Sequence, residues 1–135
     1  MDKKKMALDC HHMGYNCAQA AIIPFCDELG FDKKEVFRMA EAFGFGMGTC
    51  GTCGAVSGMA FAMGMKNSNG NLGEGERSKG ATYKLIKEAI EKFEAKNSSI
   101  ICKDLKGMET GTPLRSCDGC IEDAVEIIEE MLSKM

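Results

Sequence analysis

The sequence predicts an all-α protein: one domain over residues 1–135, built as a compact bundle of about six helices. Three observations lead to this fold class. Apolar residues recur at helical spacing in several segments, and no segment shows the alternation that is typical of a strand. Glycine-rich and asparagine-rich stretches separate those segments. A chain of 135 residues, 44% of them hydrophobic and 27% charged, is also long enough to bury a core without disulfide bonds.

The first part of the chain is expected to form short helices. Residues 3–13 and 17–29 are predicted as two of them, the second with Pro24 inside it. Asp32 begins the next helix, because Glu35 follows three residues later as in a capping box. The inward face of that helix is expected to contain Val36, Met39, Ala40 and Phe43.

Two helices are predicted in the middle of the chain, and they are the central helix and the longest helix of the fold. Residues 53–65 are small or flexible and apolar, and Gly54 and Gly58 lie on one side, where another backbone could approach closely. This segment is therefore expected to be central. A polar surface loop over 67–75 follows it, and the longest helix is predicted over 76–96. The apolar stripe of the longest helix comprises Tyr83, Ile86, Ile90 and Phe93.

The end of the chain is expected to hold a short element and one long helix. Cys102 lies in a short turn or helix within 98–107, and 111–113 form an irregular link. The last helix begins near Ser116 or Cys117. Its inward positions are Ile121, Val125, Ile128 and Leu132. Its acidic residues are expected to form a solvated face, comprising Glu122, Asp123, Glu126, Glu129 and Glu130.

Charge and hydropathy exclude several classes of partner. A net charge of −3 argues against a nucleic-acid-binding surface. The most apolar stretch, 55–65, is shorter than the roughly 20 residues that span a bilayer, and the N-terminal residues lack the apolar core of a signal peptide. We therefore expect a cytoplasmic protein without membrane insertion. In that reducing compartment, eight cysteines indicate metal binding or redox chemistry rather than structural disulfides.

The segment 44–58 is the most informative of the chain. Its glycines deliver Cys50 and Cys53 to the start of an apolar helix, where free backbone amides favour the thiolate. A second C-x-x-C pair, Cys117 and Cys120, lies near the start of the last helix. This spacing lets two thiolates reach one metal ion. The gap between the pairs far exceeds that of a zinc ribbon, so any shared site must be assembled by the fold.

Other patterns are weaker. A thioredoxin-like use of C-x-x-C requires a βαβ setting, and neither pair is followed by the histidine of a c-type haem site. The glycines over 46–51 match G-x-G-x-x-G by letter, but no strand precedes them, so nucleotide binding is not expected. Nothing in the sequence indicates a hydrolytic triad or a carboxylate pair. The eleven methionines are expected to serve as core packing.

Two adjacent histidines stand beside a cysteine near the N-terminus. Neighbouring residues on a helix point about 100° apart, so at most one of His11 and His12 could share a metal site with Cys10. We expect both histidines to be surface residues.

Five segments of the chain carry a recognisable pattern. They are Gly14-Tyr-Asn-Cys17-Ala-Gln-Ala, Phe43-Gly-Phe-Gly-Met-Gly48, Cys53-Gly-Ala-Val-Ser-Gly58, Cys102-Lys-Asp-Leu105, and Cys117 ahead of Asp123-Ala-Val-Glu-Ile. In order and spacing, these segments resemble the C_GCAxxG_C_C family of small redox-active proteins. That family is defined by four cysteines and a Cys-Gly-Ala-x-x-Gly motif, and the resemblance covers nearly the whole chain.

The resemblance implies which cysteines matter. The four family positions match Cys17, Cys53, Cys102 and Cys117. The remaining cysteines are particular to this chain, namely Cys10, Cys26, Cys50 and Cys120. Spacing alone nominates the two C-x-x-C pairs, so both lines of reasoning agree on Cys53 and Cys117.

Three functions remain open at this point. The first is electron transfer or redox sensing through an iron–sulfur cluster on the four family cysteines, with Cys50 and Cys120 as alternate ligands. The second is metal-free thiol–disulfide chemistry, in which Cys53 attacks, Cys50 resolves, and the disulfide passes to Cys117 and Cys120. The third is a structural zinc site in an interaction module. The expected partner is a redox protein whose identity the sequence does not give, and a homodimer with a shared site stays open, as does enzymatic turnover.

Overall fold

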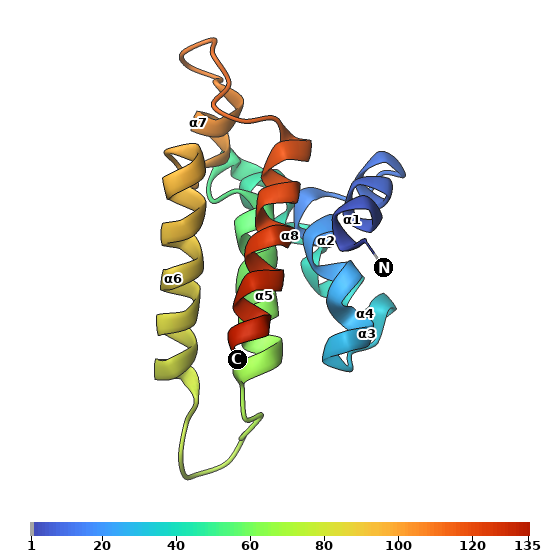
Figure 1. The fold of residues 1–135 in the computed structure, drawn as a ribbon, viewed down its shortest axis with the longest axis vertical. Coiled ribbons are helices and arrows are strands. Elements are labelled where there is room, and N and C mark those ends of the chain that lie inside the picture. Colours follow the sequence, from blue (N-terminus) through green and yellow to red (C-terminus); the bar gives the residue numbers. More distant parts are fainter. Residues whose placement is uncertain (1) are drawn as a thin grey trace.

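Helices joined by turns and by two longer loops, over 68–78 and 107–116, make up the computed structural model, which describes residues 2–135 (Figure 1). Within these residues no strand occurs, and Thr52 and Ile101 form an isolated antiparallel bridge. The all-α prediction is therefore confirmed. In chain order the elements are α1 (Lys3–His12), α2 (Cys17–Ile22), the turn η1 (Ile23–Phe25), α3 (Cys26–Leu29), α4 (Lys33–Ala40), the turns η2 (Glu41–Phe43) and η3 (Gly46–Cys50), α5 (Gly54–Asn67), α6 (Lys79–Asn97), α7 (Cys102–Lys106) and α8 (Cys117–Lys134).

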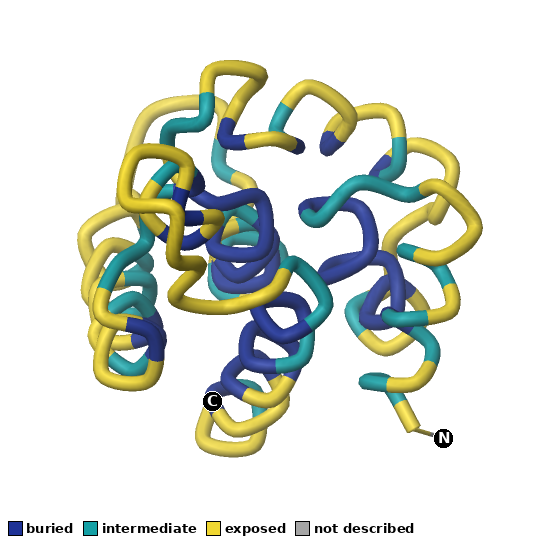
Figure 2. The backbone as a smooth tube through the Cα atoms, turned by 90° about the horizontal axis from the view of Figure 1, so that it is seen from above, coloured by how far each residue is buried: buried dark blue, intermediate teal, exposed yellow. Residues whose placement is uncertain are grey.

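Helix α5 is the centre of the fold. It packs against α2 on one side and against α6 and α8 on the other, so the shorter helices α1–α4 and the two long helices enclose it (Figure 1). Buried residues follow the facing sides of these helices, and exposed residues follow their outer sides (Figure 2). The helix contributes Ala55, Met59, Ala62 and Met63 to the core. No helix within residues 2–135 combines the length and the hydropathy needed to cross a membrane.

Two glycines allow α2 to lie directly on α5. A Cβ atom added to Gly58 would lie 2.7 Å from the Cβ of Ala21. A Cβ atom on Gly54 would lie 3.0 Å from the backbone nitrogen of Ala18 and 3.1 Å from the Cβ of Cys17. These separations leave no room for a side chain. The predicted close approach at this glycine face is confirmed, and it holds the first residue of α2 beside the start of α5.

Several predicted helix boundaries differ from those of the structure. The helix predicted over 17–29 is divided, because Pro24 lies in the 3-10 turn η1 between α2 and α3. Helix α4 ends at Ala40 and buries Val36 and Ala40, so Met39 points outward and is 54% exposed.

The longest helix also departs from its prediction at its start. It begins at Lys79 rather than at residue 76, so its first turns follow the polar loop. Tyr83 there is 64% exposed, because it lines a surface hollow with residues of that loop instead of packing on another helix. The predicted stripe holds from Ile86 onward: Ile86 and Ile90 are partly buried against the core, and Ala89 and Phe93 are fully buried.

Candidate thiol site

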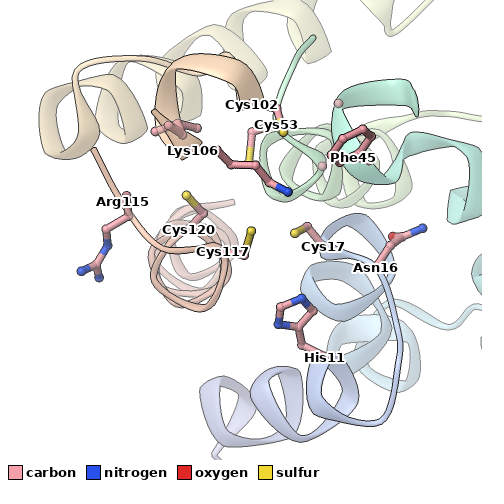
Figure 3. Close-up of a pocket in the computed structure, with 13 residues that line it drawn as sticks. His11, Asn16, Cys17, Phe45, Cys53, Cys102, Lys106, Arg115, Cys117 and Cys120 are labelled. Carbon is pink, nitrogen blue, oxygen red and sulfur yellow. The ribbon is translucent and has the colours of Figure 1, made fainter. Parts of the chain in front are cut away.

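Five cysteines line one cavity of about 170 Å³, which we call the thiol cavity (Figure 3). They come from four separate segments of the chain, and they are Cys17, Cys53, Cys102, Cys117 and Cys120. The four cysteines that match the family positions are thus brought together, with Cys120 as a fifth. Cys50 lies outside the lining, although its charge acts on Cys102. Cys10 and Cys26 pack elsewhere, against the hydrophobic core.

Helix α2 presents Cys17 as its first residue. The preceding Asn16 caps this helix: its side chain accepts a hydrogen bond from the backbone N–H of Gln19, and the Gln19 side chain accepts one from the N–H of Asn16. This capping box fixes where α2 begins. Since Gly54 admits α2 closely, the Cys17 side chain faces the start of α5.

A short antiparallel contact holds Cys53 beside Cys102. The N–H of Cys53 donates to the carbonyl of Ile100 at 2.7 Å, and the N–H of Cys102 donates to the carbonyl of Gly51 at 2.6 Å. Each chain segment enters a helix directly after this contact: Cys53 is the N-cap of α5 and Cys102 is the first residue of α7. Two cysteines far apart in sequence are therefore fixed side by side by backbone hydrogen bonds.

Helix α8 supplies the remaining two sulfurs. The Ser116 side chain accepts a hydrogen bond from the N–H of Gly119 and so caps the helix at Cys117. Residues three apart share a helix face, so Cys120 points to the same cavity as Cys117. Each family cysteine thus lies at the start of a helix, where backbone N–H groups lack helical partners.

Hydrogen bonds make the Cys53 thiol more acidic than an ordinary cysteine. Its pKa is lowered to about 7, first by the hydrogen bond from the Cys120 thiol and then by the N–H groups of Ala55 and Val56, with a further contribution from Lys106. These interactions outweigh the burial that favours the neutral thiol. The predicted effect of the helix start on this sulfur is therefore present.

Three other thiols of the cavity hold their protons more strongly. The pKa of Cys120 is raised, because its thiol donates to the Cys53 sulfur and because it is buried. Burial raises the pKa of Cys17 to about 12, aided by the neighbouring Cys117 and Cys53. Burial also raises the pKa of Cys102. In the metal-free cavity, Cys53 is consequently partly ionised near neutral pH, while Cys17, Cys102 and Cys120 keep their protons.

The glycine loop before Cys53 has an unusual backbone. Phe45, Met47 and Cys50 have positive φ angles of 52°, 59° and 60°, which L residues rarely adopt. Gly46 between them has φ 58° and lines the cavity, and a Cβ atom there would clash with the backbone of Gly51. Such strain is held where it serves a site. Here it brings Gly46 close to Cys102, since a Cβ atom on Gly46 would lie 3.0 Å from the Cβ of Cys102.

Basic side chains stand at the rim of the thiol cavity. Lys106 extends over it, with its Nζ atom 4.6 Å from the ring centre of Phe45 (Figure 3). Lys106 lies four residues after Cys102 on the same helix, so this spacing could have identified it from the sequence. Arg115 also lines the cavity, two residues before Cys117.

The buried carboxylate of Asp123 binds Arg115. Its Oδ2 atom accepts a hydrogen bond from Arg115 Nε at 3.2 Å and another from Asn97 Nδ2 at 3.1 Å. Asp123 is only 8% exposed, so the prediction that it belongs to a solvated acidic face was wrong. The helical pattern of the sequence does not predict this burial, because Asp123 faces α6, where Asn97 is its hydrogen-bond partner. Asp123 thus connects Arg115, which precedes α8, with Asn97 at the C-terminal end of α6.

The family model described as "Putative redox-active protein (C_GCAxxG_C_C)" matches residues 15–131. The chain belongs to the C_GCAxxG_C_C family. The match includes each of the five cysteines that line the thiol cavity, and the resemblance seen in the sequence is confirmed. No curated protein and no solved structure matches the chain. The family description assigns redox activity and specifies no cofactor.

Proposed function

We propose that this member of the C_GCAxxG_C_C family holds an iron–sulfur cluster in the thiol cavity and passes electrons to a partner redox protein. The observation behind this proposal is the gathering of five cysteines from four segments around one cavity. The ligands would be Cys17, Cys53, Cys102 and Cys117, with Cys120 as the alternate. When bound, such a cluster supplies one-electron transfer.

The donor set fits an iron–sulfur cluster. Iron–sulfur clusters take cysteine thiolates as ligands, and no carboxylate lines the cavity among the residues that the structure describes. A structural zinc ion also accepts four cysteines, but it is enclosed by sulfurs about 2.3 Å away. A cavity of about 170 Å³ is larger than a single enclosed ion needs. The volume therefore favours a polynuclear group over zinc.

The charge around the cavity also fits. Four thiolates add negative charge that a buried site must balance. Lys106 supplies positive charge at the rim, and the N–H groups of Ala55 and Val56 already donate to the Cys53 sulfur. Hydrogen bonds to ligand sulfurs of this kind raise a reduction potential. These groups would thus balance the charge of the cluster and raise its reduction potential.

A second function is supported by the hydrogen bond between Cys120 and Cys53. The Cys53 thiolate would attack one sulfur of a disulfide substrate, form a mixed disulfide and release the other sulfur as a thiolate. The Cys120 sulfur, after losing its proton, would then attack Cys53 and release the second thiol. The substrate gains two electrons and a Cys53–Cys120 disulfide forms. The hydrogen bond favours Cys120 over Cys50 as the resolving partner.

The two functions predict different colour and metal content of the purified protein. Anaerobic purification followed by a visible spectrum and by iron, sulfide and zinc analysis is expected to give a coloured protein with iron and sulfide in stoichiometric amounts. A colourless protein that contains no metal and one titratable disulfide would reject the cluster and support thiol–disulfide chemistry. Zinc in stoichiometric amounts without iron would support the structural zinc site.

The pH dependence of alkylation tests the thiol pair. In metal-free protein, the rate of Cys53 alkylation should rise with pH and reach half its maximum near pH 7, because the Cys53 pKa is about 7. Cys120→Ala removes the donor hydrogen bond and should move the midpoint to higher pH, whereas Cys26→Ala should leave it unchanged. Mass spectrometry of alkylated peptides gives both rates. An unshifted midpoint in Cys120→Ala would contradict the hydrogen bond.

A further inference from the structure

A second group of metal-binding side chains lies beside the thiol cavity, at the contact between α1 and α8. Asp118 in the first turn of α8 meets both histidines from the last turn of α1. Its Oδ1 atom lies 2.6 Å from His11 Nδ1, and its Oδ2 atom lies 2.9 Å from His12 Nε2. One ligand atom from each side chain lies within 4.8 Å of the others. We call this the histidine–aspartate group.

We propose that His11, His12 and Asp118 bind a divalent transition-metal ion such as Zn²⁺ beside the five thiols, at a site whose His11 also lines the thiol cavity. Two imidazole nitrogens and a carboxylate oxygen form a donor set that suits zinc and its neighbours. Calcium and magnesium prefer oxygen ligands alone. The chemistry of the group therefore selects a transition metal.

Different ring atoms allow two adjacent histidines to converge. Neighbouring residues on a helix point about 100° apart. His11 offers the near nitrogen Nδ1 and His12 the far nitrogen Nε2, and each meets a different oxygen of the same carboxylate. The expectation that both histidines are only surface residues therefore missed their shared partner on α8, which is 106 residues away from His12 in sequence.

The present distances are close to those that an ion requires. Metal–ligand bonds of about 2.1 Å at tetrahedral angles place neighbouring ligand atoms about 3.4 Å apart. The two nitrogen–oxygen separations are 2.6 and 2.9 Å. One nitrogen of each histidine and one oxygen of Asp118 lie within 4.8 Å of one another, so side-chain rotations can bring the three atoms around one ion. The side chains have room to rotate, because the His12 side chain is 60% exposed and that of Asp118 is 42% exposed.

The surroundings favour a bound cation. The C-terminal end of α1 bears partial negative charge, which stabilises positive charge near the two histidines. The exposure of the group lets an ion enter and lets water complete the coordination, as in zinc sites with three protein ligands. A metal here would join α1 to α8 directly next to Cys117.

Zinc added to the tag-free full-length chain tests this site by X-ray absorption at the zinc edge. The chain has two histidines, so imidazole scattering can come only from His11 or His12. Because His11 also lines the thiol cavity, loss of this scattering in His12→Ala is what assigns it to the histidine–aspartate group. We expect nitrogen and oxygen neighbours with imidazole scattering once zinc exceeds what the thiols bind. Equilibrium dialysis should then show that Asp118→Asn lowers the affinity for this zinc ion by at least about tenfold. Removal of an outer partner of a metal site already lowers the affinity by about that factor, and Asp118 would be a direct ligand.

Matched variants separate binding from folding. Asp9→Asn removes another exposed α1 carboxylate, which pairs with Lys5, and should bind zinc as wild type does. His12→Ala should lose zinc as Asp118→Asn does, while Met13→Ala beside it should not, and circular dichroism verifies the fold of each. Zinc with sulfur neighbours alone, or equal zinc affinity in Asp118→Asn and wild type, would overturn the proposal and leave the group as a hydrogen-bonded contact between α1 and α8.

Discussion

Serine at position 53 is expected to remove the bound iron, at least about tenfold below wild type, whereas serine at position 50 should leave iron content unchanged. Cys53 lines the thiol cavity at the start of α5, and its pKa of about 7 lets it ionise near neutral pH. A serine hydroxyl keeps its proton near neutral pH and replaces that thiolate poorly. Cys50 belongs to the same glycine loop but lies outside the cavity lining.

Iron and sulfide analysis of the two variants, purified anaerobically in parallel, checks this prediction. Circular dichroism must show wild-type helix content in both, because loss of a ligand can unfold a metal-binding domain. If Cys50→Ser lost as much iron as Cys53→Ser, the C-x-x-C pair itself would be the ligand unit, and the proposed ligand set would be wrong.

Valine at position 58 is expected to destabilise the metal-free protein by about 1–3 kcal/mol, the usual cost of overpacking a core. The Cβ of any residue larger than glycine would lie 2.7 Å from the Cβ of Ala21, and a branched side chain would push α2 away from α5. Because Cys17 begins α2, the same displacement would withdraw one sulfur from the thiol cavity. Gly58→Val should therefore lose iron as well as stability.

Gly64→Ala is the matched control on the same helix. A Cβ atom at position 64 meets nothing within 4 Å, so alanine there should be neutral or should stabilise the helix by up to about 1 kcal/mol. Urea unfolding of both variants measures the free energies. A Gly58→Val protein as stable as wild type would show that α2 and α5 do not need the close contact.

The sequence predicts those parts of the site that depend on local pattern. Glycines four apart indicated the close approach at α5, and the helix start after the glycine loop indicated an acidic Cys53. The family resemblance identified four of the five lining cysteines before any geometry was known. Each of these signals lies within a short stretch of chain or in one family motif.

The parts that the sequence did not predict depend on contacts between distant segments. Asp123 was assigned to the solvated face, because only the fold brings Asn97 and Arg115 to it. The link between Cys53 and Cys120, rather than Cys50, follows from how α8 meets the start of α5. No local pattern encodes either contact, since both arise from the packing of whole helices.

The central claim is that iron occupies the thiol cavity. Anaerobically grown crystals of the full chain, measured at the iron absorption edge, test it most directly. We predict an anomalous peak between the sulfurs of Cys17, Cys53, Cys102 and Cys117, with sulfur–iron contacts to at least three of them. Crystals that show no iron peak in this cavity, or that show a disulfide between Cys53 and Cys120 in its place, would contradict the claim.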